Sequence, residues 1–347
     1  MIKLSQILLL RFRSGRLRSG IDLGQRRALF ALVLALALCG TSADTAAQAT
    51  AKPFRVAFLS SARGPTPFYA ALKEGLRELG LVEGQNLVLE YRSSEDRNQL
   101  AAMAAELVKL KADAIVSPGP AARVLKTVTT TVPIVFGFSG DPVEAGFVNS
   151  LARPGTNMTG MSFMAQDLAG KRLELLREAV PKVSRIAIVS TRTHPGEKNE
   201  FQETQTAARA MKTVLQYLPV TTTRDIDNAF DMILKERAEA VLTFPDAVTL
   251  AHRAQLADFA SKHKLPTMFG WNQYVEAGGL MSYGPNLNDS YRRLAVIVHK
   301  ILKGTKPADI PVEQPTKFEL VINLKTANQI GVTIPPNVLA RANRVMK

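Results

Sequence analysis

Short apolar runs, each followed by a longer stretch with helical spacing, recur along the chain. In the first half they are 55–61 (RVAFLSS), 112–117 (ADAIVS) and 132–138 (VPIVFGF). Their apolar positions are consecutive and do not alternate with polar ones, which is typical of strands buried on both faces of a parallel sheet. Between them, apolar residues recur at helical intervals, as at Phe68 and Leu72. The pattern predicts an α/β fold with parallel strands and right-handed crossovers.

The second half of the chain repeats this pattern. Runs 185–191 (RIAIVST), 238–243 (AEAVLT) and 265–271 (LPTMFGW) resemble the three above, at offsets of 130, 126 and 133 residues. Chance similarity between apolar strands would explain one such pair. Three pairs in the same order at nearly one offset indicate a domain duplication instead. The sequence therefore predicts two similar α/β lobes joined near residue 155.

The segment that joins the lobes is poor in both helix and strand character. It is 141–160 (DPVEAGFVNSLARPGTNMTG), in which glycine, proline and asparagine recur at short intervals. Together with four later segments, it resembles the substrate-binding proteins of ABC transporters, in the subfamily whose characterised members bind aromatic amino acids. Those segments are 171–189, 278–287, 291–315 and 318–336. The resemblance covers essentially the whole chain after the leader.

This resemblance implies a type I periplasmic-binding-protein fold. In that fold two doubly wound parallel-sheet lobes are joined by three crossovers and hold a ligand in the cleft between them. The expected lobes are 54–157 plus 272–314 (lobe one) and 158–271 plus 315–347 (lobe two). Strand 280–284 and helix 289–303 are then expected in lobe one, and Phe318–Leu324 is expected to return to lobe two.

The first 49 residues have the pattern of an export signal. Arginines precede the apolar run Ala28–Leu38, which is too short for a permanent membrane span, and a small-residue stretch ends in Ala47-Gln48-Ala49. Residues 1–49 are therefore predicted to be a secretory signal peptide cleaved after Ala49, and the mature protein is predicted to be periplasmic. A later translation start and a twin-arginine signal at Arg26-Arg27 are the alternatives. The ordinary export route is favoured because most of the twin-arginine pattern is missing.

Cys39, the sole cysteine of the sequence, lies in this leader. Lipid attachment requires a small residue before the cysteine, whereas Leu38 stands there, so a lipoprotein is the less favoured alternative. Cleavage would leave a mature chain without thiol or disulfide, whose stability depends on two ordinary cores. The net charge of +14 is spread along the chain without a clustered basic and aromatic patch, so nucleic acid is not an expected partner.

Candidate binding residues follow from the position of the strand ends, because open parallel sheets bind ligands beyond the carboxyl ends of their strands. The duplication sets three pairs of such loops opposite each other. The candidates are Ser60, Ser61, Gly119, Pro120, Ala121, Phe138 and Ser139 from lobe one, and Thr191, Asp246, Trp271 and Asn272 from lobe two. This set suits a small zwitterion. Helix N-termini would bind its carboxylate, Asp246 its ammonium, and Phe138 or Trp271 its apolar side chain.

Each candidate also has a purely structural interpretation. From the residues alone, an N-cap for a helix over 247–264 is the favoured role of Asp246, and Trp271, the sole tryptophan, is a candidate core residue. The resemblance favours a ligand role for Asp246, since family members bind the ligand's amino group with an Asp in the matching loop. It also implies a ligand contact for Asn199, which follows Glu197 in a loop similar to one of the family.

The sequence lacks the usual signs of catalysis. The four histidines show no metal-ligand spacing, the thiol is in the leader, and neither GxxxxGK[ST] nor G-x-S-x-G occurs. No enzyme activity, cofactor or metal is therefore expected. The favoured interpretation is an exported, monomeric receptor with no transmembrane segment in the mature chain. It captures an amino acid or aromatic acid by hinge closure and delivers it to an ABC permease of the inner membrane. The alternative is a ligand-sensing subunit for a chemoreceptor or sensor kinase.

Overall fold

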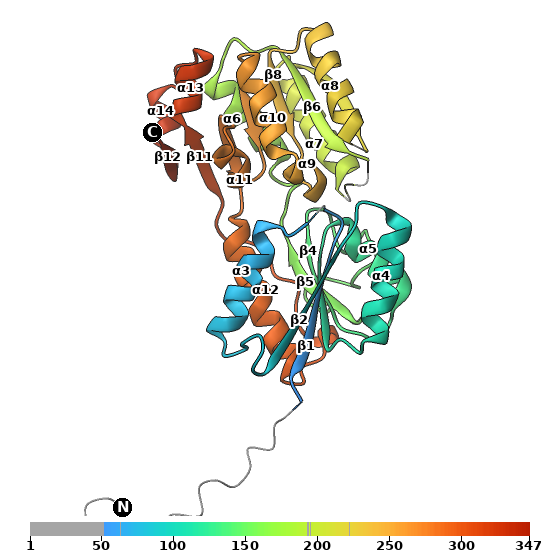
Figure 1. The fold of residues 1–347 in the computed structure, drawn as a ribbon. Helices are drawn as coiled ribbons and strands as arrows, with labels where there is room; N and C mark the ends of the chain where they lie inside the picture. Colours follow the sequence, from blue (N-terminus) through green and yellow to red (C-terminus); the bar gives the residue numbers. More distant parts are fainter. Residues whose placement is uncertain (1–51, 63, 193, 195, 222) are drawn as a thin grey trace, which may run out of the picture. The chain divides into compact units, whose positions relative to one another are not determined.

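The computed structural model describes residues 52–347 except 63, 193, 195 and 222. The predicted signal peptide, 1–49, lies outside these described residues. The described chain is built around two sheets (Figure 1), which confirms the predicted α/β class with two parallel-sheet lobes. Within the described part, every helix is too short or too polar to cross a membrane.

Lobe one has a five-stranded, fully parallel sheet with the strand order β2-β1-β3-β4-β5. Its strands are β1 (Phe54–Ser60), β2 (Leu87–Ser93), β3 (Ala114–Pro118), β4 (Ile134–Phe138) and β5 (Met158–Ser162). Its helices are α3 (Pro67–Glu78), α4 (Arg97–Lys109), α5 (Pro120–Val128) and α12 (Leu287–Leu302), with a 3₁₀ turn η1 (Pro307–Asp309). All residues of β3 and β4 are buried, as expected for strands covered on both faces.

Lobe two has a seven-stranded sheet with the order β12-β11-β10-β9-β8-β6-β7. Its strands are β6 (Arg185–Thr191), β7 (Val214–Val220), β8 (Ala240–Thr243), β9 (Thr267–Phe269), β10 (Met281–Gly284), β11 (Glu319–Asn323) and β12 (Arg344–Met346). Its helices are α6 (Ala169–Ala179), α7 (Glu197–Ala210), α8 (Thr223–Lys235), α9 (Ala247–Ala251), α10 (Arg253–Lys262), α11 (Asn272–Glu276), α13 (Leu324–Ile330) and α14 (Pro336–Leu339). The strands pair in parallel except β10 and β11, which are antiparallel.

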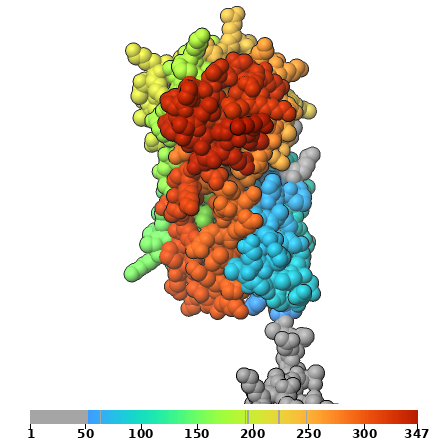
Figure 2. All heavy atoms as spheres, turned by 90° about the vertical axis from the view of Figure 1, so that its left-hand side faces the viewer, coloured from blue at the N-terminus to red at the C-terminus, as the bar shows by residue number. Residues whose placement is uncertain are grey.

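Strand β10 lies in lobe two, not in lobe one as the sequence analysis expected. It pairs with β9 through Met281 and Met268, and Met281 and the preceding Leu280 belong to the lobe-two core. Helix α11 supplies a short crossover between β9 and β10, so the chain crosses to lobe one after Gly284 and not at 272–279. Beyond this crossing, α12 packs against α3 of lobe one, as expected, and Figure 2 shows α12 in orange beside α3 in blue.

The first boundary between the lobes lies later than the expected residue 157, because β5 is the last strand of the lobe-one sheet. Its glycine and polar residues (MTGMS) give a weak strand pattern, which is why it was not predicted. Gly160 lies opposite Phe136 with φ +154°, and a Cβ there would stand 2.0 Å from the Phe136 carbonyl oxygen. The first crossing therefore begins after Ser162, and the last returns from η1 to β11.

Two predicted helices are shorter than expected. The helix over 247–264 is divided at His252 into α9 and α10. The expected terminal helix in 335–347 is reduced to α14, because Arg344–Met346 pairs with β11 as an edge strand.

The close approach at Gly160 can be tested by unfolding. We expect Gly160→Ala to lower the free energy of unfolding by more than about 1 kcal/mol, since the added Cβ collides with backbone that β4 and β5 need for pairing. Gly170→Ala is the matched control: it lies in α6, and its Cβ would meet Ala207 at an ordinary 3.6 Å. Urea unfolding should show the control unchanged or stabilised by up to about 1 kcal/mol. Equal stability of the two variants would contradict this packing.

Candidate functional site

A small pocket lies at the carboxyl ends of the strands and is lined by residues of both lobes. The lobe-one side consists of Phe68, Pro118, Gly119, Gly137, Ser139, Phe163, Leu287 and Tyr291, and the lobe-two side of His194, Asp246 and Trp271. Its own side chains nearly fill it: the cavity volume is about 10 Å³, the space of about one water molecule. A larger molecule can enter only if the lining residues move apart.

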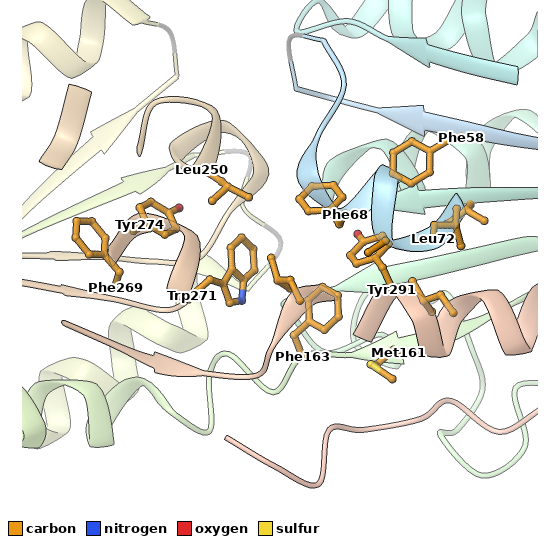
Figure 3. Close-up of a cluster of buried hydrophobic side chains, with 14 of the residues drawn as sticks. Phe58, Phe68, Leu72, Met161, Phe163, Leu250, Phe269, Trp271, Tyr274 and Tyr291 are labelled. Atoms are coloured by element: carbon orange, nitrogen blue, oxygen red, sulfur yellow. The ribbon is translucent and has the colours of Figure 1, made fainter. Parts of the chain in front are cut away.

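Four aromatic side chains line the pocket, and Figure 3 shows them within a cluster of buried apolar residues: Phe68, Phe163, Trp271 and Tyr291. Phe68 and Tyr291 stack with ring centroids 4.6 Å apart, and Phe163 meets Trp271 edge-on at 6.2 Å. Gly137 of β4 makes room for this arrangement, since a Cβ there would lie 2.8 Å from the Tyr291 hydroxyl. Such a wall can bury a large apolar or aromatic group of a ligand.

Three buried polar atoms in the pocket wall have no hydrogen-bond partner among the described residues. They are Trp271 Nε1, the Tyr291 hydroxyl and His194 Nδ1. Burial raises the pKa of the Tyr291 phenol, so this group stays neutral and can both donate and accept. An unsatisfied buried polar group costs roughly 1–3 kcal/mol. These atoms are therefore positions at which a polar ligand would gain stabilising hydrogen bonds.

Asp246 serves two purposes with its two carboxylate oxygens. Oδ1 accepts a hydrogen bond of 2.7 Å from the backbone N–H of Val248, which caps α9. Oδ2 lies 3.9 Å from Nδ1 of His194, and the residue is 2% exposed. The capping interpretation of Asp246 is thus correct, and the second oxygen is still available at the pocket.

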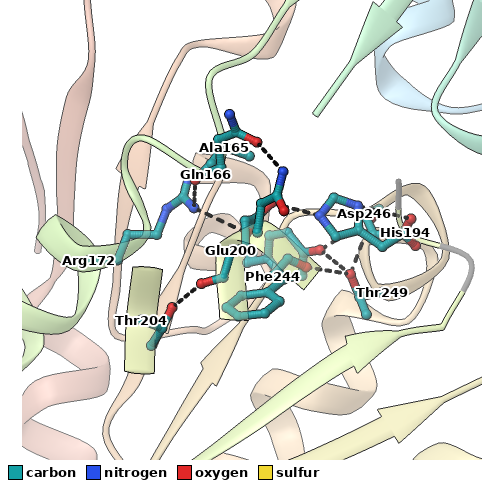
Figure 4. A network of polar contacts seen from close by, with 11 residues as sticks. Ala165, Gln166, Arg172, His194, Glu200, Thr204, Phe244, Asp246 and Thr249 are labelled. Carbon is teal, nitrogen blue, oxygen red and sulfur yellow. Dashed lines mark hydrogen bonds and ion pairs between the residues drawn. The ribbon is translucent and has the colours of Figure 1, made fainter. Parts of the chain in front are cut away.

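A chain of buried charges leads away from Asp246 into lobe two (Figure 4). His194 Nε2 and Glu200 Oε1 are 2.7 Å apart, and Glu200 Oε2 lies 3.7 Å from Nη1 of Arg172. Arg172 is fully buried on α6 and donates to the carbonyl oxygens of Ala165 and Tyr283, at 3.0 and 2.9 Å. The guanidinium thus contacts both the segment that enters α6 and the end of β10.

The carboxylates in this line of contacts favour the charged form of His194. Burial lowers the pKa of His194. The charge and hydrogen bond of Glu200, together with the charge of Asp246, raise it by more than burial lowers it, so the pKa lies above its ordinary value of 6.5. Burial lowers the pKa of Arg172, which nevertheless remains a cation because an arginine is not deprotonated in proteins. The line of contacts thus alternates two basic and two acidic side chains. Within the described chain, this cluster included, no group of three or more His, Cys, Asp and Glu is suited to hold a metal ion.

Helix N-termini contribute positive potential to the pocket. Phe68 is in the first turn of α3, Gly119 is the N-cap of α5, and Leu287 is the first residue of α12, and all three line the pocket. Gly119 has φ +49°, a conformation that favours glycine, and Pro120 follows it at the first helical position. Helix N-termini attract anions through their N–H groups, so the lobe-one side suits a carboxylate.

The structure brings four of the sequence-predicted residues together at the pocket, namely Gly119, Ser139, Asp246 and Trp271. The others do not line it: Ser60, Ser61, Pro120, Ala121, Phe138, Thr191, Asn199 and Asn272. Ser60 Oγ accepts a hydrogen bond from the N–H of Ala62, and Asn199 donates to Glu144 and Gln166. The hydroxyls of Ser61 and Thr191 and Oδ1 of Asn272 are buried without a partner in the described structure.

The expectation that Phe138 covers a ligand requires correction. Phe138 and Ala121 are fully buried in the core between the sheet of lobe one and α4 and α5, where Phe138 packs 4.6 Å from the ring of Phe147. Successive strand residues point to opposite faces, so the pocket receives Gly137 while Phe138 enters the core. The pocket aromatics Phe68, Phe163 and Tyr291 come instead from helix starts and from the segment after β5.

His194 was also missed by the sequence analysis. It is three residues beyond the end of β6, and the backbone N–H of His194 donates to the carbonyl oxygen of Thr191 in a tight turn. Its place in a loop after a parallel strand was a usable signal. Metal-ligand spacing, the criterion applied to the histidines, does not detect a single imidazole in the wall of a pocket.

Comparison with known proteins bears directly on this arrangement. The family model of the ABC transporter substrate-binding protein matches residues 59–346. The chain belongs to this family. The family consists of solute-binding receptors.

Individual relatives are similar over most of their length. A solved conserved domain protein of Vibrio cholerae O1 biovar El Tor N16961 is 28% identical, with a TM-score of 0.78 over 85% of this chain and 100% of that one. An ABC domain of Streptococcus pneumoniae, solved with L-Trp, is 26% identical, with a TM-score of 0.78 and the same coverage. A tyrosine-binding protein of Clostridioides difficile (strain R20291) is 23% identical over 262 residues, 75% of each chain. These likenesses confirm the expected type I periplasmic-binding-protein fold.

The buried charges predict that replacing Arg172 strongly destabilises the fold. We expect Arg172→Met to lower the free energy of unfolding by about 3–5 kcal/mol, because it leaves an uncompensated carboxylate in the core. Adding Glu200→Gln should recover part of the loss. Arg177, on the same helix, is half-buried and has no ion pair among the described residues, so Arg177→Met should change the free energy of unfolding by no more than about 0.5 kcal/mol. A loss below about 1 kcal/mol for Arg172→Met in urea unfolding would contradict this.

Proposed function

We propose that the protein is an exported receptor that captures an amino acid with a large apolar or aromatic side chain and delivers it to an ABC permease. The observation that carries this proposal is the combination of one carboxylate, Asp246, with an aromatic wall in the same pocket. A carboxylate selects a cation, and the rings select an apolar group. A free amino acid of this kind carries both on one carbon atom.

A binding arrangement follows from the charges around the pocket. The ligand's ammonium pairs with Oδ2 of Asp246, and its carboxylate faces the N-terminal turns of α5 and α12. Its side chain lies among Phe68, Phe163 and Tyr291. Trp271 Nε1 and the Tyr291 hydroxyl would pair with polar atoms of the ligand, such as its carboxylate oxygens, an indole N–H or a phenol.

The relatives support this class of ligand. The Streptococcus pneumoniae structure holds L-Trp, and the Clostridioides difficile relative is described as tyrosine-binding. Membership of the ABC transporter family favours delivery to a permease over the sensing alternative, and it accords with an export signal in residues 1–49.

Ligand entry requires the lobes to move. The closed pocket has room for about one water, whereas the three crossings between the lobes allow a hinge motion. Arg172 fixes the lobe-two ends of two crossings through the carbonyl oxygens of Ala165 and Tyr283. The bending therefore falls on the residues between these anchors and lobe one.

The role of Asp246 can be separated from its capping role. We expect Asp246→Asn to keep the melting temperature, because Asn caps a helix as well as Asp does. It should lower the affinity for L-tryptophan or L-tyrosine by roughly ten-fold to a hundred-fold, since a hydrogen bond to a charged group contributes about 1.5–3 kcal/mol. Calorimetric titration and thermal unfolding measure the two effects.

Asp258→Asn, an exposed position on α10, is the matched control and should change neither quantity. Two results would count against the proposal. One is parent-like affinity of Asp246→Asn for both amino acids. The other is failure of the parent protein to bind either of them.

A further inference from the structure

The gap between His194 and Asp246 has the dimensions of an ammonium site. Nδ1 of His194 and Oδ2 of Asp246 are 3.9 Å apart, too far for a hydrogen bond with each other. Two acceptors at this separation can both lie about 2.8–2.9 Å from one nitrogen placed between them. Both residues line the pocket, and His194 Nδ1 is buried and unpaired within the described structure.

Glu200 decides which ring nitrogen of His194 can serve this site. An ionised carboxylate only accepts hydrogen bonds, so the 2.7 Å contact between Glu200 Oε1 and His194 Nε2 requires a proton on Nε2. Glu200 is itself fixed by Arg172 and by its position on α7. The nitrogen that gains or loses a proton is therefore Nδ1, the one directed at Asp246.

We propose that His194 is a second ligand-binding residue, which releases its Nδ1 proton to water when a ligand's ammonium occupies the gap beside Asp246. The imidazole then keeps its Nε2 proton on Glu200 and accepts an ammonium N–H at Nδ1. This inference rests on the proposed amino-acid function. It adds that the free protein holds its own cation at the position of the ligand's amine, and that binding exchanges one cation for the other.

The charged groups around His194 explain why a ligand's ammonium can replace the positive charge of the ring. The groups that face it are Glu200 and Glu197 of α7, Asp246 before α9, Arg172 of α6 behind Glu200, and the neutral phenol of Tyr291 from lobe one. In the free protein the charge and hydrogen bond of Glu200 and the charges of Asp246 and Glu197 hold the pKa of His194 above its ordinary value, which favours the protonated ring. An ammonium arriving beside Asp246 takes over the pairing and repels the ring proton.

The sign of the pH dependence follows from linkage. Binding lowers the pKa of His194, so the deprotonated ring favours the complex, and affinity for an amine rises with pH. The rise should approach tenfold per pH unit between the pKa of the complex and that of the free protein, and should stop above the latter. A ligand without an amine has no ammonium to exchange for the proton.

The test is calorimetric titration of the parent protein with L-tryptophan in buffers of different ionisation enthalpy, from about pH 6 to about pH 9. We expect up to one proton released per ligand bound, and none with 3-indolepropionate, the same molecule without its amine. Nitrogen NMR of labelled histidine should show one ring changing from a cation to the neutral form protonated at Nε2. That signal should be missing from His194→Gln.

Two variants test whether the proton released on binding comes from His194. His194→Gln should bind L-tryptophan without proton release and with a flat pH profile, whereas His299→Gln, at the far end of α12, should behave as the parent does. Binding of L-tryptophan by the parent without proton release at any pH overturns the role of His194 and leaves the amino-acid function intact. If the parent binds neither L-tryptophan nor L-tyrosine, the role of His194 and the amino-acid function are both overturned. If His194→Gln fails to fold, proton release in the titration of the parent is by itself the test of the role of His194.

Discussion

Four buried ionisable side chains in one continuous line of contacts constrain this structure more than any other feature. Each buried ion costs several kcal/mol of desolvation unless an opposite charge offsets it. Arg172, Glu200, His194 and Asp246 meet this requirement by alternating in sign along their contacts. The inner end of the line is Arg172, buried on α6 in lobe two, and the outer end lies at the pocket. Under the proposed function, the charge of the ligand joins these charges there.

This arrangement couples the site to the parts of the chain that connect the lobes. Arg172 reaches the carbonyl oxygen of Ala165, within the crossing into lobe two, and that of Tyr283, just before the crossing out of it. Asp246 caps α9 with one oxygen and faces the pocket with the other. The polar half of the pocket is therefore held rigidly by lobe two, while lobe one supplies aromatic rings and helix N-termini. A solute that needs both halves favours the state in which the lobes enclose it.

Much of the fold was predictable because it depends on patterns repeated within the chain. Fully apolar runs mark β1, β3, β4 and their counterparts in lobe two, and strand-end position led to Gly119, Ser139, Asp246 and Trp271. Strand β5 escaped prediction because Gly160 is required by backbone contact and not by apolar burial. The crossing at 272–279 was placed too early because α11 is a short connection within one sheet, which apolar periodicity does not distinguish from a connection between lobes.

The missed pocket residues have a different cause. Phe68 and Tyr291 carry the apolar spacing of core helix positions, and their place at helix starts turns them toward the pocket. Phe138 was misplaced by one residue, which in a strand changes the face. His194 depends on partners far away in sequence, above all Asp246, that no local pattern reveals.

A crystal structure of the protein with L-tryptophan tests the central proposal most directly. The proposal predicts the ammonium between Oδ2 of Asp246 and Nδ1 of His194, the carboxylate at the first turn of α5 or α12, and the indole among Phe68, Phe163 and Tyr291. An ammonium directed away from Asp246, or L-tryptophan bound outside this pocket, would contradict it.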